Sequence, residues 1–171
     1  MALLRSEGLR PRVALAGGGS RRHERRARRL CTRLGLDDQV EFLGRRTDVP
    51  ALLMSRQICV LSSHYEGMPL TLVEAMAAGC VAVGSAVPGI REMLSDGVDG
   101  RVFAHASAPA LAAVLRDLLD RPQEAAAIAQ RGRDVAASRY TLQGMLARYE
   151  FAFAEMVRRD AVPVLHSPMV A

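Results

Sequence analysis

Short apolar runs alternate with amphipathic stretches along the chain up to residue 104. Runs rich in Val, Ile and Leu predict buried strands, and the stretches between them carry apolar residues at helical spacing. Strands are expected at 13–16, 40–43, 58–61, 81–83 and 101–103, and helices at 22–34, 49–55, 69–78 and 90–94. Such alternation is typical of parallel strands joined by crossover helices. The predicted fold class is therefore α/β, with a doubly wound parallel sheet.

Beyond residue 104 the pattern changes to helices alone. One apolar stripe at helical spacing carries Leu111, Val114, Leu115 and Leu118. Pro122 interrupts it, and further helices are expected to about residue 135 and at 141–157. A chain of 171 residues provides material for one buried core. We expect one domain over 1–158 that ends in these extra helices, followed by a loose tail at 159–171.

The positive charge of the chain comes from arginine alone. All 23 basic residues are Arg, and the formal net charge is +5. The first long predicted helix is the richest, with Arg21, Arg22, Arg25, Arg26, Arg28, Arg29 and Arg33. This helix could bind nucleic acid, but a solvated outer face explains most of its arginines, so we expect no nucleic-acid partner. Phosphate-bearing ligands or an anionic membrane surface are compatible with such a charge.

The cysteines and histidines show no metal-ligand or disulfide spacing. The three cysteines, Cys31, Cys59 and Cys80, are expected to be small core residues in a reducing cytoplasmic protein. His64 either faces a ligand or bonds a nearby carbonyl. Surface positions are expected for His23, His105 and His166. No segment is long and apolar enough to span a bilayer.

The loops that follow the strands are the candidate ligand-binding positions. In an open doubly wound sheet, ligands bind at the carboxyl ends of the strands. Gly17 and Gly18 follow the first strand and precede the arginine-rich helix, where backbone amides could meet a phosphate. A simple tight turn between strand and helix explains the same glycines.

The loop after the third strand carries the most specific pattern. Glu66 follows the buried strand, Gly67 permits an unusual backbone turn, and Glu74 lies within the next helix. Between the two carboxylates, free amides near Leu70, Thr71 and Leu72 would face a diphosphate, while the carboxylates accept hydrogen bonds from sugar hydroxyls. This predicts a pocket for a nucleotide sugar. The two glutamates could instead be the acid and nucleophile of a glycoside hydrolase. This is disfavoured, because a helix N-terminus stabilises the ionised carboxylate, whereas a general acid needs a raised pKa. A purely structural cap remains the alternative.

This segment, 62–79, resembles the donor-binding signature of retaining GT-B glycosyltransferases of family 4, the glycosyl transferases group 1. Similarity extends to 16–19, 40–44, 87–92 and 96–100. The resemblance implies the Rossmann-like C-terminal half of a GT-B enzyme, a nucleotide-diphosphate sugar as donor, and no metal or cofactor. It assigns Glu66 to hydroxyls of the transferred sugar and Glu74 to the ribose diol. The other implied donor contacts are Gly17, Gly18, Gly44, Arg45, Gly67, Met68, Leu70, Thr71 and Leu72.

The resemblance also implies a protein partner. Complete enzymes of this type hold the acceptor on an N-terminal domain, and their donor domain opens with a strand for which this chain shows no counterpart. We therefore expect a donor-binding half that is inactive alone and is completed by an N-terminal domain or a separate subunit. It would work in the cytoplasm, including at the inner membrane face. The alternatives are a nucleotide-sugar-binding module without transfer and an arginine-rich nucleic-acid-binding protein.

Overall fold

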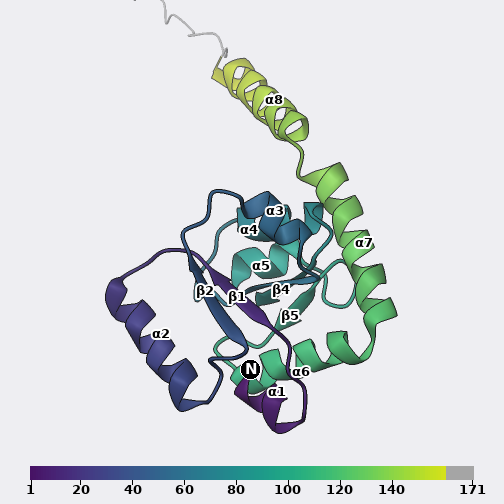
Figure 1. Cartoon of the computed structure of the whole chain (residues 1–171). Coiled ribbons are helices and arrows are strands. Elements are labelled where there is room, and N and C mark those ends of the chain that lie inside the picture. Colours follow the sequence, from purple (N-terminus) through teal and green to yellow (C-terminus); the bar gives the residue numbers. More distant parts are fainter. Residues whose placement is uncertain (161–171) are drawn as a thin grey trace, which may run out of the picture.

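The structure is a computed structural model that describes residues 1–160 (Figure 1). The strands are β1 (Val13–Ala16), β2 (Val40–Gly44), β3 (Ile58–Leu61), β4 (Val81–Ser85) and β5 (Arg101–Phe103). The helices are α1 (Ala2–Ser6), α2 (Arg21–Arg33), α3 (Val49–Met54), α4 (Leu70–Ala77), α5 (Pro88–Met93), α6 (Ala108–Asp120), α7 (Pro122–Arg139) and α8 (Leu142–Asp160). Each predicted element is present, within about four residues of its expected bounds; the largest difference is at the end of α7. The predicted tail lies outside the described residues from position 161 onward.

All strand pairs are parallel, which confirms the predicted α/β class. The strands form two sheets rather than one: β1 pairs with β2, and β3, β4 and β5 form a second sheet in that order. Helix α3 connects β2 to β3 and so runs from one sheet to the other, whereas α4 connects the neighbouring strands β3 and β4. The two helices pack against each other. Figure 1 shows the β1–β2 pair beside α2 and the second sheet within the surrounding helices.

Strand β4 is the centre of the core. All five of its residues are buried, as expected for an inner strand of a parallel sheet covered on both faces. One face packs against α4 and α5 through Leu72, Met76 and Ile90. The opposite face packs against α6 and α7 through a cluster that contains Phe103, Val114, Leu118 and Ile128. The well-packed second sheet therefore supports the loop after β3, which carries the predicted site residue Glu66.

Strands β1 and β3 each have one edge without a strand partner in the described sheets. The Val81 N–H donates to the Gln57 carbonyl at 2.8 Å. The main-chain N–H and C=O groups of odd-numbered residues in this part of β3 therefore point toward β4. Main-chain groups alternate sides along a strand, which directs those of Ile58 and Val60 to the other edge. An edge of this kind can accept a further parallel strand.

The side chains near these edges are also incompletely covered. Leu15 of β1 is 43% exposed and Val60 of β3 is 40% exposed, although strands of parallel sheets are normally buried on both faces. Helix α2, which follows β1, contributes no buried residue. The β1–β2 layer is thus much less well packed than the sheet around β4.

Helix α8 extends away from both sheets (Figure 1). It exposes a stripe of apolar residues at helical spacing: Leu142, Met145, Leu146, Tyr149, Phe153, Met156 and Val157. The Tyr149 and Phe153 rings stack with centroids 6.1 Å apart. Isolated exposed apolar residues are common, but a continuous stripe of this length marks an interaction surface.

An ion-pair network joins β5 to α6 and gives the first prediction. The Arg101 guanidinium bonds Asp117 and also contacts Asp96 at 3.0 Å. The hydrogen bond from Arg101 lowers the pKa of Asp117 below its usual value of 3.8. A depressed carboxyl pKa contributes stability that is present above the unfolded-state pKa and is lost as the pH falls through the folded-state value.

Asp117→Asn should therefore lower the free energy of unfolding at neutral pH by about 1 kcal/mol, which corresponds to about 2–4 °C in Tm. This value allows for the partial solvent exposure of the pair. The difference from the unsubstituted chain should begin to shrink below about pH 4 and should vanish once the pH is below the lowered folded-state pKa of Asp117. Thermal unfolding followed by circular dichroism at several pH values measures this. Asp120→Asn, an exposed aspartate on the same helix, is the matched control and should be neutral. A deficit that persists in acid would contradict the electrostatic explanation.

Candidate functional site

The loop between β3 and α4 is held by two serine hydroxyls. Ser85, at the end of β4 and 1% exposed, donates its Oγ–H to the Ser63 carbonyl at 2.6 Å. Ser63 in turn donates its Oγ–H to Glu66 Oε1 at 2.6 Å. Glu66 is half-buried. The carboxylate that the sequence assigns to the sugar is therefore oriented by a side chain of its own loop, with one oxygen left for another donor.

The close approach in this loop occurs at Gly89 rather than at Gly67. The expectation of an unusual backbone turn at Gly67 is wrong, because its φ is not positive and a Cβ there would meet no atom within 4 Å. A Cβ at Gly89 would lie 1.9 Å from the Gly67 carbonyl oxygen and 2.4 Å from that of Glu66. The N-terminal turn of α5 thus packs directly on the loop backbone, and only glycine fits there.

Helix α4 begins beside this loop, with Pro69 as its N-cap and no side chain capping it. Among the described residues, no hydrogen bond from the Leu70 or Thr71 N–H is found, so both donors are free for an anion. Leu72 differs from the expectation. Its amide donates to the Pro69 carbonyl at 3.0 Å and its side chain is fully buried, so it anchors the helix in the core.

The remaining residues predicted in this segment lie on the surface. Glu74 is exposed on α4, one turn beyond the free amides, and Met68 and Leu70 are more than half exposed. Burial raises the pKa of the Cys59 thiol to about 11, with smaller contributions from Cys80 and from the Glu74 carboxylate. Glu74 therefore lies on the surface of α4, in the same segment as Glu66.

The first two loops form a second cluster. The Gly17 N–H donates to the Gly44 carbonyl at 2.8 Å, and Gly44 has a left-handed φ of 62°. A Cβ on Gly18 would lie 2.4 Å from Cγ of Arg45, so the two loops touch. Arg46 pairs with Asp48 at 2.6 Å, whereas Arg45 forms no ion pair within the described residues. Four of the predicted residues are therefore adjacent, with the Arg45 guanidinium free.

No hydrogen bond or ion pair within residues 1–160 joins this cluster to the Glu66 loop. Both clusters follow the carboxyl ends of parallel strands, but they belong to different sheets. The structure thus places the predicted residues at corresponding strand ends in two groups. The first holds Gly17, Gly18, Gly44 and Arg45, and the second holds Glu66, Gly67, Met68, Leu70, Thr71 and Glu74.

A histidine pair was missed by the sequence analysis. His64 Nδ1 lies 3.1 Å from His105 Nε2, with the rings edge to face. His105, expected at the surface and exposed there, follows β5 as His64 follows β3. Each of the two histidines comes shortly after a parallel strand, and this shared position in the sequence could have indicated that they lie close together. His64 therefore bonds an imidazole and not a carbonyl.

The expectation that cysteines are core residues holds best for Cys80. It is buried, and its Sγ lies 3.2 Å from the Leu53 carbonyl, to which it donates. Cys31 and Cys59 are half-buried, and all three thiols are free. Within residues 1–160 no three His, Cys, Asp or Glu side chains lie together as metal ligands, and no helix is long and apolar enough to cross a membrane.

Parallel strands with crossover helices, and a loop with a free helix N-terminus at the strand ends, define a Rossmann-like α/β domain of the GT-B glycosyltransferase type. The chain belongs to the Glycosyl transferases group 1 family, whose model matches residues 1–135. This covers every residue of both site clusters.

Individual relatives agree with the family. MMP alpha-(1->4)-mannosyltransferase of Mycolicibacterium hassiacum is 32% identical over 78% of this chain and 33% of its own length. HepE of Anabaena, crystallised with UDP, superimposes with a TM-score of 0.80 at 25% identity, over 85% of this chain and 41% of HepE. The C-terminal domain of a Francisella tularensis group 1 glycosyl transferase superimposes with a TM-score of 0.69 at 19% identity, over 81% of this chain and 91% of that domain. The chain spans about a third of the length of the curated relatives it matches.

Proposed function

We propose that this chain is the donor-binding, C-terminal part of a retaining GT-B glycosyltransferase of family 4. It binds a nucleotide-diphosphate sugar, without metal or cofactor, for transfer to an acceptor held by an N-terminal domain or a separate subunit. The observation that carries the proposal is the arrangement before α4. An oriented carboxylate, Glu66, and an exposed one, Glu74, flank the free amides of Leu70 and Thr71.

Each group has a chemical role in this proposal. Glu66 accepts hydrogen bonds from hydroxyls of the transferred sugar, and Ser63 holds it in place. The amides of Leu70 and Thr71, at the positive end of α4, bind the diphosphate. Glu74 accepts from the ribose diol. The backbone at Gly44 and Arg45 lies beside the nucleobase, and Gly17 and Gly18, which touch it, leave room for the donor to approach the backbone.

The open surfaces support the partner in this proposal. Strands β1 and β3 each offer an unpaired parallel edge, and α8 offers an apolar stripe. One further parallel strand between β1 and β3 would join the two sheets and cover Leu15 and Val60. That would also bring the two site clusters onto one continuous sheet, as a nucleotide bound at both requires. We place the whole assembly in the cytoplasm.

The binding test is a calorimetric titration of the purified chain with UDP, GDP and ADP. UDP is tried first, because HepE was crystallised with it. The proposal expects one of the three to bind measurably, with its affinity increased when the completing domain is supplied. If all three bind more weakly than about 1 mM, with and without that domain, the donor-site proposal fails. Binding without any transfer after completion would instead identify a nucleotide-sugar-binding module.

The chain alone is expected to transfer no sugar. Holding an acceptor hydroxyl against the donor contributes about 7–11 kcal/mol of barrier lowering, and the acceptor-binding surface lies outside this chain in the proposal. The measurement is release of nucleoside diphosphate from UDP- and GDP-sugars with added acceptor sugars, against the rate without acceptor. Acceptor-dependent turnover by the purified chain at rates typical of enzymes would contradict the split assignment.

A further inference from the structure

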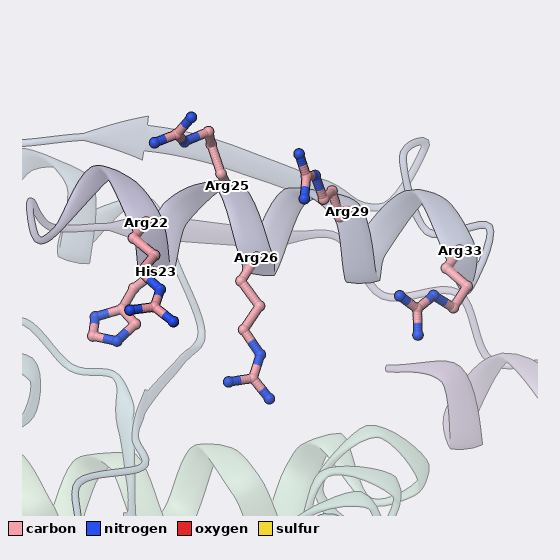
Figure 2. A pocket seen from close by; sticks show the side chains of 6 residues that line it. All are labelled: Arg22, His23, Arg25, Arg26, Arg29 and Arg33. Carbon is pink, nitrogen blue, oxygen red and sulfur yellow. The ribbon is translucent and has the colours of Figure 1, made fainter.

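Five arginines lie along one face of α2. They occupy positions i, i+3, i+4, i+7 and i+11, which fall on the same side of a helix, and we call them the arginine stripe: Arg22, Arg25, Arg26, Arg29 and Arg33. With a rise of about 1.5 Å per residue, the stripe is about 16 Å long. Together with His23 it lines an open cavity of about 570 Å³. Figure 2 shows the six side chains spread along the helix, with the Arg25 guanidinium toward one edge of this face and those of Arg26 and Arg33 toward the other.

The stripe has no acidic counterpart within the described residues. By contrast, Arg28 of the same helix contacts Glu24 at 2.8 Å. None of the stripe residues forms an ion pair, and Arg25 Nε donates only to the Arg21 carbonyl at 3.3 Å. Five guanidinium groups with fixed charge therefore face solvent together. Their mutual repulsion destabilises the free helix and would be relieved by a bound anion.

The packing of α2 directs the stripe outward. The Arg28 guanidinium lies over the Phe42 ring of β2, 4.3 Å from its centroid, and the half-buried residues Ala27 and Cys31 lie on that side of the helix. The stripe is on the opposite side. At the edge of the stripe, Leu30 is 49% exposed. The outward face of α2 therefore combines a row of arginines with one exposed leucine at its edge.

We propose that this face of α2 binds the surface of an anionic phospholipid bilayer. Guanidinium groups bond lipid phosphates in a planar, bidentate manner, and a straight row of them matches a flat array of headgroups. Leu30, beside the row, enters the headgroup region, as the apolar side of an interfacial helix does. A nucleic acid fits less well, because the exposed Leu30 at the edge of the stripe would stay in water. The proposal does not rest on glycosyl transfer.

The test is vesicle flotation with the purified chain. Vesicles of phosphatidylcholine alone are compared with vesicles of phosphatidylcholine and phosphatidylglycerol. The chain should float with the anionic vesicles only, and about 1 M NaCl, where the Debye length is about 3 Å, should weaken binding at least tenfold. Inorganic phosphate at equal ionic strength should compete no better than chloride, since the ligand is a surface and not a single phosphate.

Two charge-matched variants make the assignment specific. Arg22→Gln, Arg26→Gln and Arg33→Gln together should weaken vesicle binding at least tenfold. The control replaces three exposed arginines that form no ion pair, Arg56, Arg133 and Arg148, by Gln and should leave binding within about twofold. Circular dichroism confirms that both variants are folded.

Three outcomes would overturn the proposal. One is an equal loss of vesicle binding in the two triple variants, and another is no binding of the unsubstituted chain to anionic vesicles. The third is tighter binding to duplex DNA than to the vesicles at the same salt concentration, which would make the stripe a nucleic-acid surface. Loss of vesicle binding leaves the nucleotide titration unaffected, so failure here is distinct from failure of the donor site.

Discussion

Gly89→Ala is expected to lower nucleotide-sugar affinity more than tenfold and to destabilise the chain by about 1–3 kcal/mol. The added Cβ would overlap the Gly67 and Glu66 carbonyl oxygens at 1.9 and 2.4 Å. These are backbone atoms at the end of a loop tied to β4 through Ser85, so the overlap is relieved only by moving the loop. Such a shift displaces Glu66 and the start of α4 together. Calorimetry with the donor and thermal unfolding measure the two effects.

Gly19→Ala is the matched control for this substitution. A Cβ at Gly19 meets no atom within 4 Å, and its φ lies outside the left-handed region. It should change neither stability nor affinity measurably. If Gly89→Ala behaves like Gly19→Ala, α5 does not support the loop, and the geometry described for Glu66 is wrong.

The order of elements could be predicted because local signals set it. Val81–Ser85 is a continuous apolar strand, and Gly79 ends the preceding helix with a φ of 85°. The loop at Glu66 could be predicted for the same reason, since strand end, proline and helix follow each other within a few residues. What holds this loop comes from elsewhere in the chain. Gly89 and Ser85 act through contacts that a single sequence does not display.

The division into two sheets has a similar cause. Periodicity predicts that residues 13–16 and 58–61 are strands, but it does not show whether they share a sheet. That depends on which strands pair, and no described strand pairs with the open edges of β1 and β3. Leu72 illustrates the same limit at one residue. Its place in the first turn of α4 suggested a free amide, whereas the turn closes onto Pro69 and leaves only Leu70 and Thr71 as donors.

Glu74→Ala and Glu66→Ala are expected to separate the two halves of a bound donor. In the proposed function Glu74 contacts the ribose, which is present in both the nucleoside diphosphate and the nucleotide sugar. Its loss should weaken both ligands about tenfold or more, because a hydrogen bond to a charged group contributes about 1.5–3 kcal/mol. Glu66→Ala should weaken only the nucleotide sugar, since the diphosphate alone presents no sugar hydroxyl to Glu66.

Calorimetric titration of both variants with both ligands measures the difference, after thermal unfolding has shown that each is folded. Ser63→Ala provides an intermediate case. It removes the hydroxyl that orients Glu66 and should repeat the selective loss in smaller degree, because the carboxylate remains but is no longer held. Glu150→Ala, an exposed glutamate on α8 with the same change in charge, should leave both affinities unchanged. Equal losses for the two ligands in both glutamate variants, or no loss in either, would remove the donor-site assignment and leave Glu66 and Glu74 as structural residues of the loop and helix.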